Sequence, residues 1–150
     1  MEDYELPALL RMVVDCNASD LFLTTGAPPQ VKVDGKVQAL PLPALRVGQA
    51  HKLAYSAMTP QAIADYERDL ECNMAYAPDG IGRFRINVYQ QRRETGLVAR
   101  LVRSDIPSFE KLGLPTTVRE MALQQRGLIL IIGAAGSGKT TTLASMVDYR

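Results

Sequence analysis

The sequence predicts an α+β domain, with helices packed on a mainly antiparallel sheet, followed by the first strand, loop and helix of an α/β domain. Short turn signals between alternating apolar and polar segments predict hairpins, and helix-like segments interrupt them irregularly. Near the C-terminus, the apolar run Leu128 to Ile132 is typical of a strand buried on both faces of a parallel sheet. A glycine-rich loop and a segment without proline or glycine, Thr140 to Tyr149, follow it.

The first half of the chain reads as one helix, three strands and two helices. Helical spacing of apolar residues predicts an amphipathic helix over residues 4 to 16, and a strand is expected over 21 to 24. The pair Asp34-Gly35 lies between alternating segments and predicts a hairpin over 31 to 40. Helices are expected over 47 to 58 and from Pro60 to about Arg68, the second capped by Thr59.

Three more strands are expected over 70 to 77, 82 to 91 and 97 to 103, with a turn at 78 to 80 and a polar turn that runs from residue 92 through Thr95-Gly96. Alternation along 82 to 91 predicts an apolar face and a basic face, the latter formed by Arg83, Arg85, Asn87 and Tyr89. A helix is expected from Pro115 to Gln124. We therefore predict a domain over 1–105, a connector over 106–120 and the start of a second domain over 121–150.

Composition narrows the functional classes. The 150 residues carry 17 Lys and Arg against 16 Asp and Glu, so no overall field favours nucleic acid or an anionic membrane. Cys16 and Cys72 match no metal-ligand spacing. The acidic N-terminus differs from a signal peptide, and no apolar run approaches the roughly 20 residues of a membrane span. We expect a cytoplasmic protein.

The segment from Gly133 to Thr140 matches G-x-x-x-x-G-K-[ST], the phosphate loop or Walker A motif. In that setting, backbone N–H groups and a helix N-terminus surround a triphosphate, while Lys139 reaches its β and γ phosphates. The Thr140 hydroxyl would hold Mg²⁺. The expected ligands are ATP and Mg²⁺, and the expected nucleotide-binding residues are Gly133, Ala134, Ala135, Gly136, Ser137, Gly138, Lys139, Thr140 and Thr141.

Arginines gather before the loop, at positions 83, 85, 92, 93, 100 and 103. Three interpretations are open: a solvated sheet face, a nucleic-acid surface, or arginines that reach the triphosphate of an adjacent subunit. Nucleic-acid binding is weakened because Tyr89 is the single aromatic residue on the basic face. Arg100 alternates with Val98 and Val102, which predicts a partly buried charge that needs an anionic partner.

The motifs Ala18-Ser19-Asp20-Leu21, Gly26-Ala27-Pro28-Pro29, Val33-Asp34-Gly35 and the run from Gly80 to Asn87 accompany the phosphate loop. Together they resemble the type IV pilus retraction ATPases, the PilT and PilU group of the secretion ATPase superfamily. Four segments resemble the PilU branch more than the PilT branch, namely residues 71–73, 105–110, 126–127 and 143–150. Many members carry His where Phe22 stands and Pro-Thr where Ala134-Ala135 stand.

This resemblance implies a PAS-like N-terminal domain followed by a RecA-like motor domain. It also implies that six subunits form a ring that powers pilus retraction and twitching motility. It implies ATP near the subunit interfaces, with Arg83, Arg85, Arg93 and Arg100 as candidate phosphate contacts, Arg85 and Arg100 first. The implied partners are identical subunits, a related retraction ATPase and the inner-membrane pilus platform, with peripheral location at that membrane. No nucleic-acid partner is expected.

A motor of this kind also needs a second carboxylate-bearing strand, the Walker B element, which these 150 residues do not supply. We expect the parent protein to be an ATPase and the 150 residues alone to be inactive. The 128 to 132 strand should dock on the first domain, pair with another chain or be disordered. The alternatives are a non-catalytic interaction module in a mixed ring and, disfavoured by the near-neutral charge, a RecA-like nucleic-acid translocase.

Overall fold

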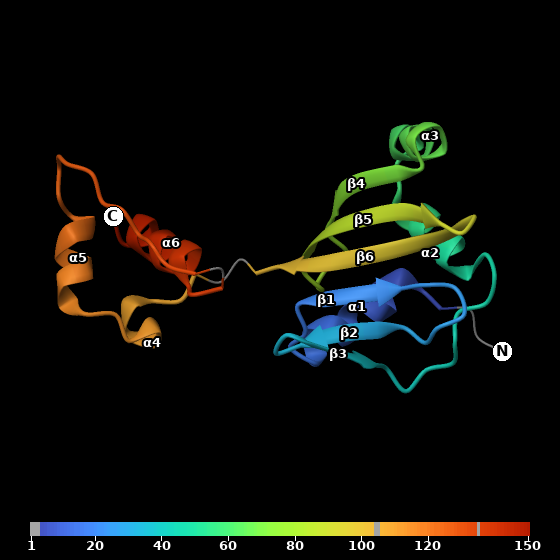
Figure 1. Cartoon of the computed structure of the whole chain (residues 1–150), viewed down its shortest axis with the longest axis horizontal. Helices are drawn as coiled ribbons and strands as arrows, with labels where there is room; N and C mark the ends of the chain where they lie inside the picture. Colours follow the sequence, from blue (N-terminus) through green and yellow to red (C-terminus); the bar gives the residue numbers. More distant parts are fainter. Residues whose placement is uncertain (1–3, 104–105, 135) are drawn as a thin grey trace. The chain divides into compact units, whose positions relative to one another are not determined.

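The computed structural model describes residues 4–103, 106–134 and 136–150 and divides into two compact units, Met1–Val102 and Arg103–Arg150 (Figure 1). Each unit is considered by itself below. The predicted boundaries after residues 105 and 120 remain a prediction.

A six-stranded antiparallel sheet forms the centre of the first unit. Its strand order is β3-β2-β1-β6-β5-β4, so β1 lies beside β6, which is far away in the sequence (Figure 1). The predicted α+β class with a mainly antiparallel sheet is confirmed. The strands are β1 Asp20–Leu23, β2 Gln30–Val33, β3 Lys36–Ala39, β4 Glu71–Tyr76, β5 Arg83–Gln91 and β6 Glu94–Val102.

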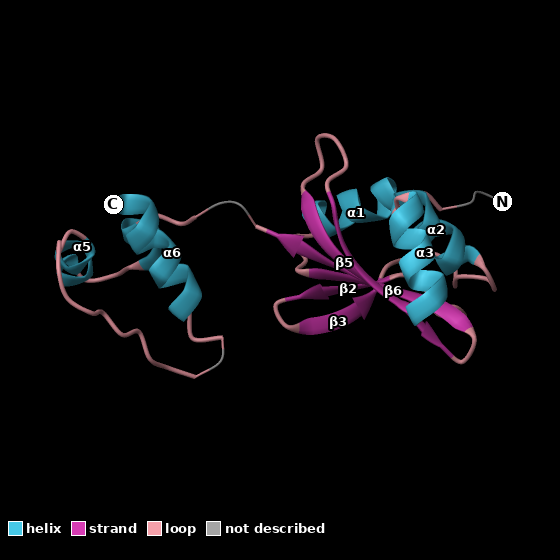
Figure 2. Ribbon diagram, turned by 90° about the horizontal axis from the view of Figure 1, so that it is seen from above, coloured by secondary structure: helices cyan, strands magenta, loops and turns pink. Residues whose placement is uncertain are grey.

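Three helices accompany the sheet, namely α1 Leu6–Asp15, α2 Gln49–Ala57 and α3 Pro60–Asp69. Figure 2 shows them on one side of the sheet. The apolar side of β5 faces this layer, and Phe84 and Ile86 are fully buried together with Leu10 of α1. Burial of each such side chain stabilises the fold by about 1.5–3 kcal/mol. Arg83 and Arg85 alternate with these residues and are exposed, which confirms the two predicted faces of β5.

The β2–β3 and β5–β6 hairpins both turn through two residues with positive φ. Asp34 and Gly35 have φ values of 49° and 80°, as the predicted Asp-Gly turn requires. The extension of the second predicted turn through Thr95-Gly96 is wrong, because Gln91 pairs with Glu94 and β6 already begins there. The turn residues are Arg92 and Arg93, both with positive φ, at 52° and 66°.

Gly96 has a role inside β6 instead. It pairs directly with Tyr89, and a Cβ atom on Gly96 would lie 2.6 Å from Cζ of that ring. The aromatic ring therefore covers the glycine, and space rather than turn formation explains the residue. A glycine beside polar residues gives the same local signal in both cases.

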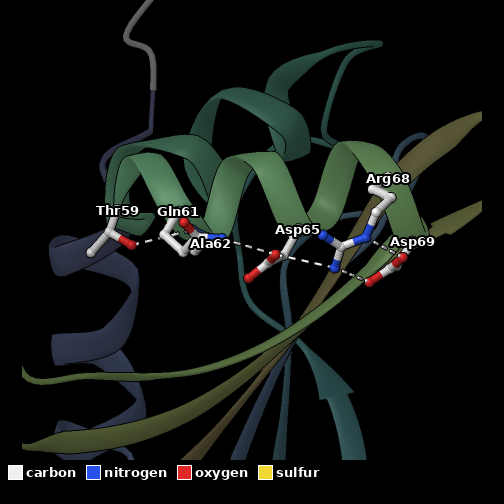
Figure 3. Close-up of polar contacts among 6 residues, drawn as sticks. All are labelled: Thr59, Gln61, Ala62, Asp65, Arg68 and Asp69. Atoms are coloured by element: carbon white, nitrogen blue, oxygen red, sulfur yellow. Dashed lines mark hydrogen bonds and ion pairs between the residues drawn. The ribbon is translucent and has the colours of Figure 1, made fainter.

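The predicted start of α3 is confirmed. The Thr59 hydroxyl accepts a hydrogen bond from the Ala62 N–H at 3.2 Å, and Pro60 is the first helical residue (Figure 3). Further along the exposed face, Arg68 contacts Asp65 at 3.1 Å and Asp69 at 2.7 Å. These exposed pairs contribute little to stability, since solvent screens them.

The second unit contains the short helices α4 Phe109–Leu112 and α5 Thr116–Ala122 and the longer α6 Lys139–Tyr149. The first two fall largely within the predicted connector. A small core joins the three helices through Phe109, Ala122 and Met146. Tyr149 packs edge-on against Phe109, with the two ring centroids 5.1 Å apart.

The strand predicted over 128 to 132 is wrong, because this segment has no strand hydrogen bonding in the structure. Leu128 is 82% exposed and Ile132 is 92% exposed, whereas Ile131 packs partly against the small core. A strand needs neighbours that accept and donate its backbone hydrogen bonds, and the described part of this unit contains no other strand. The helix predicted after the loop is confirmed and begins at Lys139.

Candidate functional site

The phosphate loop ends at the N-terminus of α6. Gly136 and Gly138 have φ values of 77° and 87°, and Gly138 directly precedes the helix. Glycine tolerates this left-handed conformation at low cost. No side chain caps the helix and no acidic residue lies in its first turn. The first N–H groups of α6 therefore lack a helical partner and can receive an anion.

Lys139 lies across this loop. Its Nζ donates a hydrogen bond to the Ala134 carbonyl at 2.6 Å, and the Ser137 N–H donates to the same oxygen at 3.3 Å. A Cβ atom on Gly133 would lie 2.7 Å from Ser137 Oγ, so a larger residue there would require the Ser137 hydroxyl to rotate away. The ammonium group is thus held beside the backbone donors that would surround a phosphate.

Thr140 and Thr141 are exposed in the first turn of α6. A hydroxyl beside a bound triphosphate is a suitable Mg²⁺ ligand, and this role of Thr140 stays a prediction. Ala135 lies outside the described residues. Among the described residues, no group of three His, Cys, Asp or Glu side chains could hold a metal ion.

The uncovered face of the sheet carries a row of charges across four strands. The register places Lys32 opposite Asp20, Asp20 opposite Arg100, and Arg100 opposite Arg85. Side chains directly opposite each other on one face lie about 4.5–5.5 Å apart at Cβ. The row therefore holds three cations and one carboxylate, and Lys32 and Arg100 are the two cations next to Asp20.

Asp20 and Arg100 form an ion pair within the row. Arg100 Nε donates to Asp20 Oδ1 at 2.8 Å, and the Ser19 hydroxyl donates to Oδ2 at 2.7 Å. The exposed fractions are 69% for the arginine side chain and 5% for the aspartate side chain. The predicted anionic partner exists, but the predicted partial burial of Arg100 is wrong, because the carboxylate is the buried member.

Burial alone raises the pKa of Asp20. The hydrogen bonds from Ser19 and Arg100 and the positive charges of Arg100 and Lys32 outweigh it, so the pKa lies below its usual value. Asp20 is therefore charged at neutral pH, and the row keeps a net positive charge.

The other predicted arginines, Arg83 and Arg93, lie at opposite ends of the β5–β6 hairpin. Arg83 starts β5 opposite Val102, while Arg93 lies in the β5–β6 turn at the other end of the hairpin. Within the described residues of this unit, Arg85 has no ion pair. The structure thus brings Arg85 and Arg100 together and keeps Arg83 and Arg93 apart from each other.

No family model matches the chain. It is 40% identical over 146 residues to the type IV pilus ATPase PilU of Pseudomonas aeruginosa, an alignment covering 97% of this chain and 38% of that relative. It is 39% identical over 145 residues to the retraction ATPase PilT of the same organism, covering 97% of this chain and 42% of PilT. This chain is a homologue of the PilT and PilU pilus ATPases.

Solved structures agree with that relationship. A crystal structure of the pilus retraction motor PilT with bound ADP matches with a TM-score of 0.85 at 38% identity, covering 97% of this chain and 43% of that one. The Legionella pneumophila ATPase DotB matches with a TM-score of 0.76 at 25% identity, covering 93% of this chain and 40% of DotB.

The predicted resemblance to the PilT and PilU group is confirmed. The assignment to a PilU-like protein agrees with the identities, which differ by one percentage point between PilU and PilT. The chain spans about two fifths of the length of these relatives. Within the described residues, no helix has the length and apolar character needed to cross a bilayer.

Sequence reasoning assigned no role to Ser19 and Asp20 of this PilT and PilU homologue, although both lie in a motif that carried the resemblance. The available signal was a carboxylate at the start of an apolar strand, Leu21 to Leu23. Its partner is 80 residues away in the sequence, so local patterns could not identify it.

Proposed function

We propose that these residues belong to a subunit of an ATP-driven motor that retracts type IV pili, and that the subunit is PilU-like. The observation that carries the proposal is the phosphate loop at the uncapped N-terminus of α6, in a chain 40% identical to PilU over 97% of its length. The parent protein then hydrolyses ATP and converts the energy into movement of domains around a ring of six identical subunits.

In this proposal the loop residues bind the triphosphate of ATP. Backbone N–H groups of the loop and of α6 stabilise the phosphate oxygens, and Lys139 moves from the Ala134 carbonyl to the β and γ phosphates. Thr140 would hold the Mg²⁺ that accompanies the nucleotide. The residues would therefore supply binding and orientation, and the metal would supply positive charge at the phosphates.

The basic row of unit 1 supplies the second part of the site. Arg85 and Arg100 are the leading candidates to approach the γ-phosphate bound by a neighbouring subunit, and Arg83 and Arg93 are further candidates. Guanidinium groups suit this task because they bind phosphate through two N–H donors at once. An arginine supplied in trans stabilises the transition-state charge.

We also propose that residues 1–150 by themselves do not turn over ATP. The segment Leu128 to Ile132 forms no strand in the structure, so the loop lacks the parallel sheet that holds it in position in such motors. The expected location is the cytoplasm, at the inner membrane through the pilus platform, and the expected ring partner is a related retraction ATPase.

The decisive experiment measures ATP turnover and twitching in the full-length parent protein with Lys139→Ala. Both should be lost, while Lys111→Ala, an exposed lysine in the same unit, should retain both. Unchanged turnover in Lys139→Ala overturns the motor proposal. Turnover that is absent from the unaltered protein favours the non-catalytic interaction module, and turnover that requires DNA or RNA favours the translocase.

A mixing experiment tests the arginines in trans. Subunits with Lys139→Ala should be inactive alone, and subunits with Arg100→Gln should keep only a small, measurable turnover. Mixed rings should recover part of the turnover, because some interfaces then combine an intact loop with an intact arginine. Absence of recovery at every mixing ratio contradicts a trans role for Arg100.

A further inference from the structure

Asp20 is the buried centre of the basic row, and nothing in the proposed chemistry uses it. We propose that Asp20 is a positioning residue, which holds the Arg100 guanidinium in the orientation needed to meet a nucleotide phosphate from a neighbouring subunit. This inference rests on the proposed function of Arg100 and adds the device that makes that arginine effective.

The geometry of the ion pair leaves the useful part of Arg100 accessible. Asp20 Oδ1 receives the Nε–H, at 2.8 Å, which is the donor nearest the aliphatic stem. The four other N–H donors are on the two terminal nitrogens, and this contact does not consume them. With 69% of the side chain exposed, the terminal nitrogens can still form a two-donor contact with a phosphate.

The neighbours of Arg100 explain why it needs to be held. Arg85 lies directly opposite on β5, and like charges at such positions repel each other. Asp20 lies directly opposite on the other side, on β1. Attraction from β1 and repulsion from β5 act in the same direction, so the guanidinium is drawn to the β1 side of its strand. An unheld arginine would sample many rotamers, each with a different phosphate distance.

Asp20 is itself fixed from several directions. The Ser19 hydroxyl donates to its Oδ2 at 2.7 Å. The Ser19 backbone N–H donates to the Lys32 carbonyl at 2.8 Å, and the Ser19 carbonyl accepts from the Leu101 N–H at 2.9 Å. Backbone hydrogen bonds therefore connect Ser19, the residue before Asp20, to both neighbouring strands, β2 and β6. A rigid supporting layer of this kind is what an effective site residue requires.

The test is a double-mutant cycle on ATP turnover in the full-length protein, with Asp20→Asn, Arg100→Gln and the pair. Asp20→Asn keeps the size of the side chain and removes its charge. We expect it to lower kcat by about 10- to 100-fold, the cost of a misplaced group, while the KM for ATP changes little. In the Arg100→Gln background, the same change should alter kcat by less than about two-fold, because residues acting through one contact are not additive.

The matched control is Asp79→Asn, an exposed aspartate in a turn of the same unit, which should leave kcat unchanged. Ser19→Ala is the milder variant in case Asp20→Asn fails to fold, and it should lower kcat less and only where Arg100 is present. Equal losses from Asp20→Asn in both backgrounds mean that Asp20 supports the fold alone, which overturns the inference.

The outcomes also separate the inference from the proposed function. If Arg100→Gln lowers kcat and neither Asp20→Asn nor Ser19→Ala does, the positioning role is wrong and the arginine role stands. If Arg100→Gln leaves kcat unchanged, the proposed role of Arg100 fails and the positioning role fails with it.

A readout on the 150-residue chain tests the contact without activity. In ¹⁵N-arginine-labelled protein, the Arg100 Nε–H should show a distinct, slowly exchanging NMR signal that Asp20→Asn moves into the envelope of exposed arginines. A signal that Asp20→Asn leaves in place contradicts the positioning contact.

Discussion

Among the described residues, Asp20 is the charged residue that is buried, with 3% of its surface exposed. A buried charge costs free energy unless hydrogen bonds and an opposite charge compensate for it. Asp20 accepts hydrogen bonds from Ser19 and Arg100, and the positive charge of Arg100 lies beside it. Its loss should therefore affect stability as well as the position of the arginine.

We expect Asp20→Asn to lower the free energy of unfolding at pH 7 by about 1.5–3 kcal/mol, as for a hydrogen bond to a charged group. Because the folded-state pKa of Asp20 lies below its unfolded value, the contribution is complete above that unfolded value, near pH 4, and is lost as pH falls through the folded pKa. Urea unfolding of both proteins from pH 7 to pH 2.5 measures the difference.

Asp79→Asn should give no such pH-dependent difference, because that side chain is exposed. A difference between wild type and Asp20→Asn that stays constant down to pH 2.5 would contradict the ion pair as its source.

Gly96 lies directly under the Tyr89 ring. A methyl group there would lie 2.6 Å from Tyr89 Cζ, so Gly96→Ala should lower the free energy of unfolding by about 1–3 kcal/mol through displacement of the ring. In a Tyr89→Ala background the same change should cost little, since the ring is gone. Chemical denaturation of the four proteins gives the coupling, and equal costs in both backgrounds would show that the ring is not responsible.

At the level of elements, the β5–β6 hairpin carries an unfavourable turn. Arg92 and Arg93 both have positive φ, which Asn and Gly adopt more easily than arginine does. We expect Arg92→Asn with Arg93→Gly to raise the free energy of unfolding by about 1–2 kcal/mol, the approximate relief of two strained residues. The urea midpoint should increase accordingly.

The Asp34-Gly35 turn is the matched control for that experiment, because it already has favourable residues at similar φ values, 49° and 80°. Asp34→Asn should change the urea midpoint very little. If the Arg92 and Arg93 changes lower stability, the arginines make contacts that outweigh the backbone strain.

At the level of the whole molecule, the two units have separate cores. The larger core includes residues from α1, α2 and all the central strands, while Phe109, Ala122 and Met146 form the smaller one. We expect a chain ending at Arg103 to unfold at the same urea concentration as unit 1 in the intact protein. Amides of α4 to α6 should exchange with solvent sooner than those of β5 and β6, because few buried contacts protect them.

Deletion of residues 1–17 is the opposing control, since it removes Leu6, Leu10 and Val13 from the larger core and should abolish cooperative unfolding. A midpoint that falls when residues 104–150 are removed would mean that the second unit stabilises the first.

The sequence by itself determined most of the secondary structure, both faces of β5, the Thr59 cap, the phosphate loop and the relationship to PilT and PilU. These features depend on local chemistry: side-chain alternation, a capping hydroxyl, and a short motif. Local patterns misplaced the β5–β6 turn, because Gly96 looks like a turn residue until Tyr89 is seen above it.

The tertiary structure decided how residues far apart in the sequence meet. It placed Asp20 opposite Arg100 and Arg100 opposite Arg85, a row that depends on the strand order and on a register no local pattern reveals. It also decided that Leu128 to Ile132 forms no strand here, since an apolar sequence favours a strand but only neighbouring strands can satisfy its backbone hydrogen bonds.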